Sequence, residues 1–382
     1  MPWQEDHLVV RKLNETDQKR LERFLEDARE KASTYLGYPA ARDLDASLLS
    51  DCLNLPLNNI GDPFAKGTWK VDSREFEREV LSFFADLLRA PGDNWWGYIT
   101  NGGTEGNLYG LYLARELYPN GMVYLSQDSH YSVMKNVHFL NMRHIMIRSQ
   151  PNGEIDYEDL RETINLHRDA PPIIFANIGT TMTEAKDDIA QVQTMIADLV
   201  IPNFYIHCDA AMSGAIAPFL DKPPPFDFAD GAHSIAISGH KFLGSAIPCG
   251  IVMALKSNVD RIARNIAYIG NLDTTITGSR NGLTPLILWQ VIWSLGREGI
   301  ADRVAEAMSL TDYAFDQMTR LCIDVCRNPN AITLYFPAPQ REVVERWQLA
   351  TNKGMSHIIL VPGTSKDLLN RFIKDLADGS RR

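Results

Sequence analysis

The sequence predicts an α/β protein in which a mostly parallel sheet forms a large domain and a smaller α+β domain follows it. Between residues 72 and 255, short, fully apolar runs alternate with helical segments, which is typical of a parallel sheet covered by helices on both faces. The chain has 382 residues, more than one ordinary core holds, and this favours two domains. After residue 285 the pattern changes to long helices with few strands. We therefore expect an N-terminal arm over 1–55, a large domain over 56–285 and a small C-terminal domain over 286–382.

The expected elements follow in chain order. Residues 15–35 have the spacing of a charged amphipathic helix, and the Gly, Pro and Asn residues that follow predict irregular loops. An Asp or Ser cap near residue 73 opens a second helix. Six apolar runs are predicted strands: GMVYLS (121–126), HIMIRS (144–149), PIIFANIG (172–179), FYIHCDA (204–210), SIAIS (234–238) and GIVMAL (250–255). Helical stretches between them include TEGNLYGLYLARELY (104–118) and DDIAQVQTMIADLV (187–200). The small domain is expected to contain long helices to about residue 321, then AITLYFPAP (331–339), a helix and HIILVPG (357–363).

The composition argues against several classes of function. Hydrophobic residues make up 45% and charged residues 23% of the chain, which is ordinary for a soluble globular protein. The formal net charge of -10 disfavours a nucleic-acid partner, because binding to phosphates requires a basic surface. No apolar run reaches the roughly 18 residues that a membrane span needs, and the N-terminus lacks the features of a signal peptide. We expect neither a nucleic-acid nor a membrane partner.

The five cysteines are odd in number and irregularly spaced. We therefore expect reduced thiols in a cytoplasmic protein and not a disulfide framework. Cys322 and Cys326, in the segment CIDVC, have neither metal-site spacing nor nearby ligand pairs. No metal site is expected.

Lys241 is the most unusual residue in the sequence. It follows the apolar run SIAIS directly after Gly239 and His240, and a second glycine turn comes shortly behind it. An ammonium group at the end of a buried strand loses hydration, which makes the charged form costly. Desolvation lowers the pKa of a lysine and leaves part of it as the free amine that a nucleophile requires. The position favours a reactive lysine over a salt bridge.

Other chemically useful residues also follow predicted strands, at the edge of the sheet where ligands bind in α/β proteins. Gly103 and Thr104 open a helix in the segment NGGTEGN and suit a phosphate, although such a segment alone is more often plain helix capping. His130 lies shortly after one strand and Asp209 at the end of another. Their ordinary alternatives are a hydrogen-bonded loop histidine and the cap of the next helix.

Together, these residues match the needs of pyridoxal 5'-phosphate. A lysine holds the cofactor's aldehyde as an imine, and an aspartate keeps the pyridine nitrogen protonated, so that the ring accepts electrons. A flat imidazole covers one face of the ring, and a glycine-rich helix start binds the phosphate. Each feature is ambiguous alone, but their combination and order favour this cofactor.

Several segments resemble the group II pyridoxal-phosphate-dependent amino-acid decarboxylases, and the likeness is closest to the short bacterial histidine decarboxylases and the plant serine decarboxylases. They are TNGGTEGNLYG, SQDSHYSVMKN, NGEIDYEDL, ANIGTTMTEAKDD, HCDAAMSGAIAPF, SGHKFLGSAIPCG and TITGSRNG. The resemblance spans roughly residues 36 to 375. It implies the aspartate-aminotransferase-like fold (fold type I) and a homodimer whose active site lies at the subunit interface.

The resemblance also implies a role for each matching residue. Lys241 would bind the cofactor covalently, and Asp209 would pair with the pyridine nitrogen. The other cofactor contacts would come from Ala211 beneath the ring, His130 on its other face, Thr181 near the ring hydroxyl, and Gly103, Thr104, Ser238 and His240 at the phosphate. Tyr268 resembles the tyrosine that places a proton on the substrate's Cα, and His130 would also lie near the substrate carboxylate.

The implied reaction removes the carboxyl group of an L-amino acid and yields an amine and CO2. The resemblance favours histidine going to histamine, with serine as an alternative substrate. Where those relatives have Ser-Arg-Asn-Gly-His, this chain has SRNGL, with Leu283 in the histidine's place. If Leu283 borders the pocket, an aliphatic substrate such as leucine, valine or methionine is favoured; otherwise Leu283 only packs beneath the small domain.

Two further alternatives belong to other classes. An aminotransferase would share the fold and the cofactor but would need an arginine that holds the substrate carboxylate in the plane of the ring, and it would yield a keto acid. A non-catalytic cofactor-binding protein would release no CO2 from any amino acid.

Overall fold

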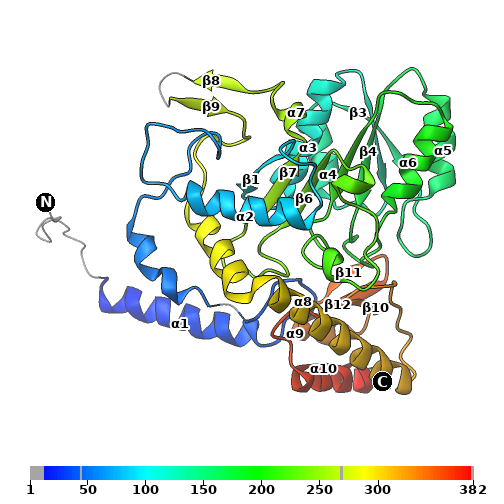
Figure 1. Cartoon of the computed structure of the whole chain (residues 1–382). Helices are drawn as coiled ribbons and strands as arrows, with labels where there is room; N and C mark the ends of the chain where they lie inside the picture. The colour runs from blue at the N-terminus through cyan, green and yellow to red at the C-terminus, as the bar shows by residue number, and fades with distance from the viewer. Residues whose placement is uncertain (1–12, 44, 267–269, 380–382) are drawn as a thin grey trace, which may run out of the picture.

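A seven-stranded sheet forms the centre of the large domain in the computed structural model, which describes residues 13–43, 45–266 and 270–379 (Figure 1). In spatial order its strands are β1 (Trp96–Thr100), β7 (Gly250–Ala254), β6 (Ser234–Ser238), β5 (Tyr205–Asp209), β4 (Pro172–Asn177), β2 (Met122–Ser126) and β3 (Arg143–Ile147). Neighbouring strands pair in parallel from β6 to β3, and β7 is antiparallel to both β6 and β1. The mostly parallel sheet is therefore confirmed.

Helices cover both faces of this sheet. One face packs against α2 (Arg74–Leu87), α5 (Tyr157–Leu166), α6 (Ile189–Asp198) and the first part of α8 (Leu283–Arg320). The other face packs against α3 (Gly103–Leu117), α4 (Ser132–Phe139) and α7 (Lys256–Val259). Six of the seven strands are buried along their whole length, which explains why their sequences are nearly continuous apolar runs.

The alternation of side chains along β5 decides which residues reach the α3 face. Tyr205 packs in the core on the α3 side, whereas Ile206 and Cys208 belong to the opposite core. Because side chains alternate along a strand, His207 and Asp209 point to the same face as Tyr205. The strand therefore presents its polar residues to α3.

A smaller α+β unit follows, below the large sheet in Figure 1. Its antiparallel sheet has the order β10 (Thr333–Pro337), β12 (Met355–Ile359) and β11 (Ala350–Asn352), and it packs with α9 (Arg341–Trp347) and α10 (Lys366–Gly379) around a separate core. α8 spans both units and kinks at Gly296, whose φ is 64°. Leu286, Ile287 and Leu288 lie in the first part of this helix and are buried.

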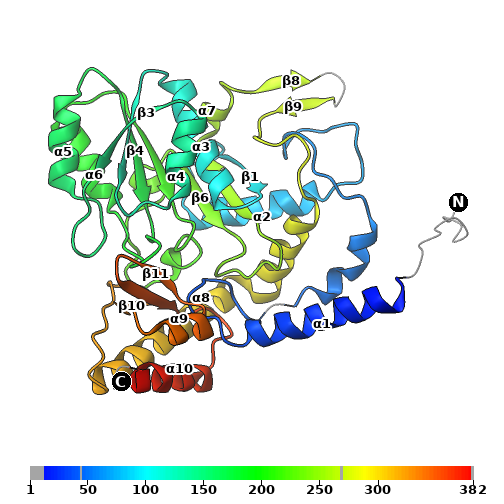
Figure 2. The ribbon, with the colours of Figure 1, turned by 180° about the vertical axis from the view of Figure 1, so that it is seen from behind.

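The N-terminal arm contains α1 (Glu15–Ala32) and the 3-10 helix η2 (Ser47–Asn54). α1 runs along the outside of the molecule, away from the large sheet, in both Figure 1 and Figure 2. None of its residues is buried. The large unit also contains an antiparallel hairpin, formed by β8 (Arg264–Ile266) and β9 (Asn271–Asp273). No helix in the described part of the chain is long and apolar enough to cross a membrane.

Candidate active site

Lys241 lies in the turn that follows β6. Its backbone is fixed because its carbonyl accepts hydrogen bonds from the N–H groups of Ala41 and Gly244, both at 3.1 Å. A Cβ on Gly239 would lie 2.6 Å from Sγ of Cys249, so only glycine fits two residues before the lysine. Burial lowers the pKa of Lys241, and the negative charge of Asp209 opposes this shift. The structure thus provides an amine that loses its proton more easily than an exposed lysine does.

Asp209 is the last residue of β5 and is 7% exposed. One carboxylate oxygen, Oδ2, accepts a hydrogen bond from Nδ2 of Asn107 at 2.8 Å, and the other, Oδ1, accepts the backbone N–H of Ala211 at 3.1 Å. The side chain does not act as the cap of a helix, because its partners are an amide on α3 and the next turn of chain. Both carboxylate oxygens are thus held by donors of the protein.

The start of α3 forms a cradle beside these residues. Gly102 has a φ of 148°, and no side chain caps the helix, so the first N–H groups of α3 have no partner within the helix. A Cβ on Gly103 would lie 2.9 Å from Oγ of Ser238 and 3.1 Å from Cβ of Ala211. Gly103 therefore lets the start of α3 pack directly against Ser238 and Ala211, and an uncapped helix N-terminus attracts a phosphate.

His240 lies next to this cradle. A Cβ on Gly102 would be 3.9 Å from Cε1 of His240. Nδ1 of His240 is held at Cys249, 2.8 Å from its carbonyl oxygen and 3.2 Å from its backbone nitrogen. Burial lowers the pKa of His240, and the positive charge of Lys241 lowers it further, while its hydrogen bond to Cys249 opposes the shift. The ring is anchored on one side and presents its other edge near the helix start.

His130 precedes α4 and is partly buried. Nδ1 lies 2.8 Å from Oγ of Ser132 and accepts the Ser132 backbone N–H at 3.3 Å. These contacts place the hydrogen of the neutral ring on Nε2. Burial lowers the pKa of His130; the negative charge of Asp209 raises it, and the charge of Lys241 lowers it. The structure therefore brings His130, Asp209 and Lys241 into one electrostatic environment.

Three further residues were predicted at the site from the sequence. Thr181 is exposed, in the loop that follows β4, and that loop starts beside Asp209 because the N–H of Ile178 donates to the Asp209 carbonyl at 2.8 Å. Leu283 is partly buried at the first position of α8, with its N–H on Oδ1 of Asn281 at 2.7 Å. Tyr268 lies outside the described residues. The roles of these three residues stay predictions.

Asn107 and His207 are buried polar residues at the site that the motif comparison did not single out. Oδ1 of Asn107 lies 2.9 Å from Nε2 of His207, whose Nδ1 lies 2.7 Å from Oγ of Ser234. The hydroxyl of Tyr205 donates to the same Ser234 oxygen at 3.0 Å. We call these four residues together with Asp209 the Asp209 network. The only sequence signal was a histidine two residues before Asp209 on an otherwise apolar strand.

The residues present fit pyridoxal phosphate. The uncapped start of α3, packed closely on Ser238 through Gly103, suits the phosphate, and the carboxylate of Asp209 suits a protonated ring nitrogen. Lys241 supplies the amine that the aldehyde requires. In the described residues, no group of three or more His, Cys, Asp or Glu side chains is arranged to hold a metal ion.

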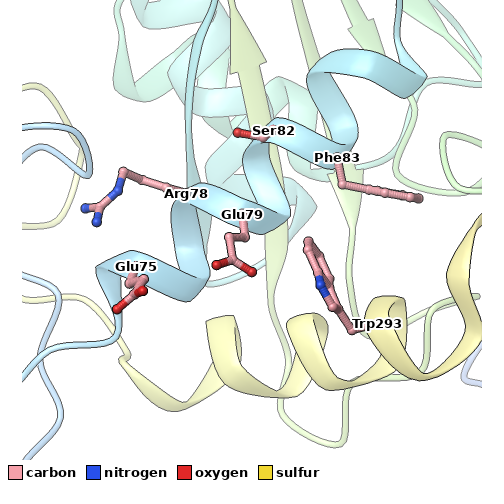
Figure 3. A pocket seen from close by; sticks show the side chains of 6 residues that line it. All are labelled: Glu75, Arg78, Glu79, Ser82, Phe83 and Trp293. Atoms are coloured by element: carbon pink, nitrogen blue, oxygen red, sulfur yellow. The ribbon is translucent and has the colours of Figure 1, made fainter.

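A separate hollow lies between α2 and α8. It is lined by Glu75, Arg78, Glu79, Ser82, Phe83 and Trp293. Figure 3 shows that Trp293 projects from α8 into the space beneath α2. The lining contains none of the residues predicted for the cofactor, so this hollow is distinct from the candidate active site.

Comparisons with known proteins agree with the site. Residues 10–330 match the pyridoxal-dependent decarboxylase conserved domain. A histidine decarboxylase of Mesorhizobium japonicum is 47% identical over 369 residues, which cover 97% of this chain and 100% of that protein. A histidine decarboxylase of Morganella morganii is 46% identical over 91% of this chain and 92% of that protein.

Solved structures support the same fold. The L-methionine decarboxylase from Streptomyces sp. 590 matches with a TM-score of 0.87 at 25% identity, over 96% of this chain and 95% of that chain. The glutamate decarboxylase of Lactobacillus brevis, 15% identical, matches with a TM-score of 0.80 over 100% of this chain and 95% of that chain and shows the fold alone. The predicted fold type I is confirmed. The aminotransferase and the non-catalytic alternatives receive no support from these relatives, and the chain belongs to the pyridoxal-dependent decarboxylases, carboxy-lyases that use pyridoxal 5'-phosphate.

Proposed function

We propose that this decarboxylase converts L-histidine to histamine and CO2. The observation that carries the proposal is the 46–47% identity to two histidine decarboxylases over at least 91% of the chain. The candidate site supports it, because Lys241, Asp209 and the α3 cradle provide what the cofactor needs. Substrate choice within the family depends on side chains that line the substrate pocket. A match over nearly the whole chain is therefore stronger support for the substrate than the matching motifs alone.

A second substrate class is favoured by two specific observations. The chain has Leu283 where histidine-specific relatives were expected to have histidine, and a matching solved structure is an L-methionine decarboxylase. An aliphatic wall at position 283 would favour leucine or methionine over an imidazole. The identity to that structure is 25%, which is well below the 46–47% of the histidine decarboxylases, and we therefore place histidine first.

The experiment is a screen of CO2 release by the purified, cofactor-loaded protein with each of the twenty amino acids. We expect histidine to give the highest kcat/KM and histamine to accumulate in equal amount to the CO2. A clear preference for methionine or leucine would overturn the choice of substrate and favour the Leu283 argument. A preference for serine would overturn it in favour of the serine alternative.

The proposed roles of the residues follow from their chemistry. When bound, pyridoxal phosphate supplies an electron-deficient ring that accepts the electron pair left at Cα by departing CO2. Lys241 binds the cofactor covalently through Nζ, and Asp209 holds the proton on the ring nitrogen by its negative charge. His130 covers one face of the ring and directs its Nε2–H toward the substrate. Tyr268 or His130 then returns a proton to Cα.

The remaining cofactor contacts are proposed in the same way. The N–H groups of Gly103 and Thr104, with the Ser238 hydroxyl and His240, bind the phosphate at the start of α3. Ala211 packs beneath the ring, in agreement with its position beside Gly103. Thr181 is proposed to approach the ring hydroxyl, although its side chain is exposed.

We also propose that the protein acts as a homodimer with its active site at the subunit interface. The support is α1, an 18-residue helix without a buried residue. Leu21, Phe24 and Leu25 share one face of this helix and are 49%, 62% and 41% exposed. Such a row of apolar residues normally packs against another surface, and a second copy of the chain provides one.

Two further expectations remain proposals. A cytoplasmic location is supported by the five cysteines, all of which are free thiols in the structure. A division into an arm (1–55), a large domain (56–285) and a small domain (286–382) is supported by the separate apolar core around β10, β12, α9 and α10.

A further inference from the structure

The Asp209 network is a continuous row of hydrogen bonds buried between β5 and α3. Tyr205, Ser234 and His207 are 0% exposed and Asn107 is 2% exposed. Such a row of buried polar groups is costly unless every member is paired. Each of these four side chains has a partner at 3.0 Å or less, and the row ends on the carboxylate of Asp209.

Asp209 fixes the direction of the donors along this row. An ionised carboxylate only accepts, so the Asn107 atom that faces it at 2.8 Å is the amide nitrogen. The amide oxygen of Asn107 then accepts from Nε2–H of His207 at 2.9 Å. Burial lowers the pKa of His207 to about 3, so Nδ1 carries no hydrogen and accepts from the Ser234 hydroxyl. Tyr205 donates to the oxygen of Ser234.

All these donors therefore point toward Asp209. Aligned hydrogen bonds polarise one another, and the last one lends its positive end to the carboxylate. The row also fixes the rotation of the carboxylate, because Oδ2 is held by α3 while Oδ1 is held by the Ala211 N–H.

The local sequence makes room for this arrangement. A Cβ on Gly110 would lie 2.1 Å from Nδ1 of His207, so a side chain there would displace the imidazole. Gly103, Asn107 and Gly110 recur at helical spacing and face the sheet together. His207 and Ser234 are register partners in the parallel pair β5–β6. One helix turn of α3 thus joins the phosphate cradle to the support of Asp209.

We propose that Asn107 and His207 are positioning residues that hold the Asp209 carboxylate in place, at the end of a row of donors, and aimed at the pyridine nitrogen of the bound cofactor. This inference rests on the proposed role of Asp209. It extends that role because it attributes the fixed orientation of the Asp209 carboxylate to a row of donors that reaches Tyr205. Neither residue touches the substrate in this account.

The test compares two ligands that differ only at the ring nitrogen. Apo protein is titrated with pyridoxal phosphate and with the analogue that has C–H in place of this nitrogen. The wild type should bind the natural cofactor more tightly, because only it can pair with Asp209. In His207→Leu the ratio of the two dissociation constants should fall by about tenfold. This is the factor expected for weakening one hydrogen bond to a charged group. A purely structural defect would weaken both ligands equally.

Three variants calibrate the result. His207→Gln keeps an N–H that can reach Asn107 and should restore most of the preference. Tyr205→Phe, at the far end of the row, should narrow it less than His207→Leu. Tyr109→Phe is the matched control: its hydroxyl is buried on α3 without a hydrogen-bond partner, and its removal should leave the preference unchanged.

An unchanged ratio in His207→Leu, or equal weakening of both ligands, would overturn the inference. If His207→Leu does not fold, Asn107→Ser provides the same comparison, because it shortens the side chain that contacts Asp209. Failure of the proposed function is a separate outcome, since the wild type would then release no CO2 from histidine whatever the ratio.

Discussion

At the scale of single residues, burial decides the protonation states around the candidate site. Lys241 loses hydration at the end of β6, and burial lowers its pKa. His207 is held neutral by the same effect, with a pKa of about 3. The first of these was predictable, because a lysine after an apolar strand and two glycine turns is visible in the sequence. The second was not, because the partner of His207 lies 100 residues away and only the packing of α3 on β5 brings them together.

His207 should make folding stability depend on pH. The unfolded protein binds a proton at this residue below about pH 6.5, whereas the folded protein resists it down to a pKa of about 3. The contribution of the neutral His207 to the free energy of unfolding is therefore fully present above pH 6.5. It is lost as the pH falls, at about 1.4 kcal/mol per pH unit. Between pH 7 and pH 5 the wild type should lose about 2 kcal/mol relative to His207→Gln.

Urea unfolding of the apo protein at both pH values measures this difference. Other buried groups, such as Asp187, whose pKa burial raises to about 7, titrate in both proteins and cancel. His144→Gln provides a matched control, because it makes the same exchange at an exposed position on β3. A wild type and a His207→Gln variant with parallel pH profiles would contradict the neutral, buried histidine.

At the scale of elements, each of the six predicted apolar runs overlaps a strand, β2 to β7. The run that became β1 was not predicted. Its sequence, WGYIT, includes Gly97, where a Cβ would lie 2.5 Å from the carbonyl oxygen of Val252. The close approach of β7 requires glycine at this position, and a glycine weakens the pattern by which a strand is predicted from sequence. The antiparallel direction of β7 also depends on chain topology, which apolar runs do not reveal.

The fit of α3 on β5 gives a prediction for Gly110. A glycine in a helix interior is normally about 1 kcal/mol worse than alanine, but here an added Cβ would lie 2.1 Å from Nδ1 of His207. We expect Gly110→Ala to destabilise the protein by about 1–3 kcal/mol and to weaken cofactor binding. Thermal melting and cofactor titration measure both effects.

The matched control is Gly278→Ala, since a Cβ at this position meets nothing within 4 Å. This variant should melt close to the wild type. If Gly110→Ala is as stable as the wild type and binds the cofactor equally well, the close packing of α3 on His207 is wrong.

At the scale of the whole molecule, the two helices of the N-terminal arm, α1 and η2, contain no buried residue. α1 contributes no buried residue, although its spacing of Leu21, Phe24 and Leu25 is that of a packed helix. The amphipathic pattern correctly predicted a helix, but one chain alone gives it no partner. We expect the second subunit to cover this face.

Sedimentation should accordingly find a particle of about 86 kDa, twice the 43.0 kDa of the chain. Phe24→Glu places a charge on the apolar face and should shift the protein toward the monomer, with loss of activity if the interface completes the site. Glu30→Ala changes the opposite face of α1 and should remain dimeric. A wild type that is monomeric and fully active would contradict the proposed dimer.

The central claim is that the cofactor is bound covalently to the lysine that follows β6. Borohydride reduction of the loaded protein, followed by digestion and mass spectrometry, tests it most directly. We expect a pyridoxyl group on the peptide that contains Lys241, and we expect this group to be absent in Lys241→Ala. A pyridoxyl group on another lysine, or on none, would contradict the covalent binding of the cofactor to Lys241.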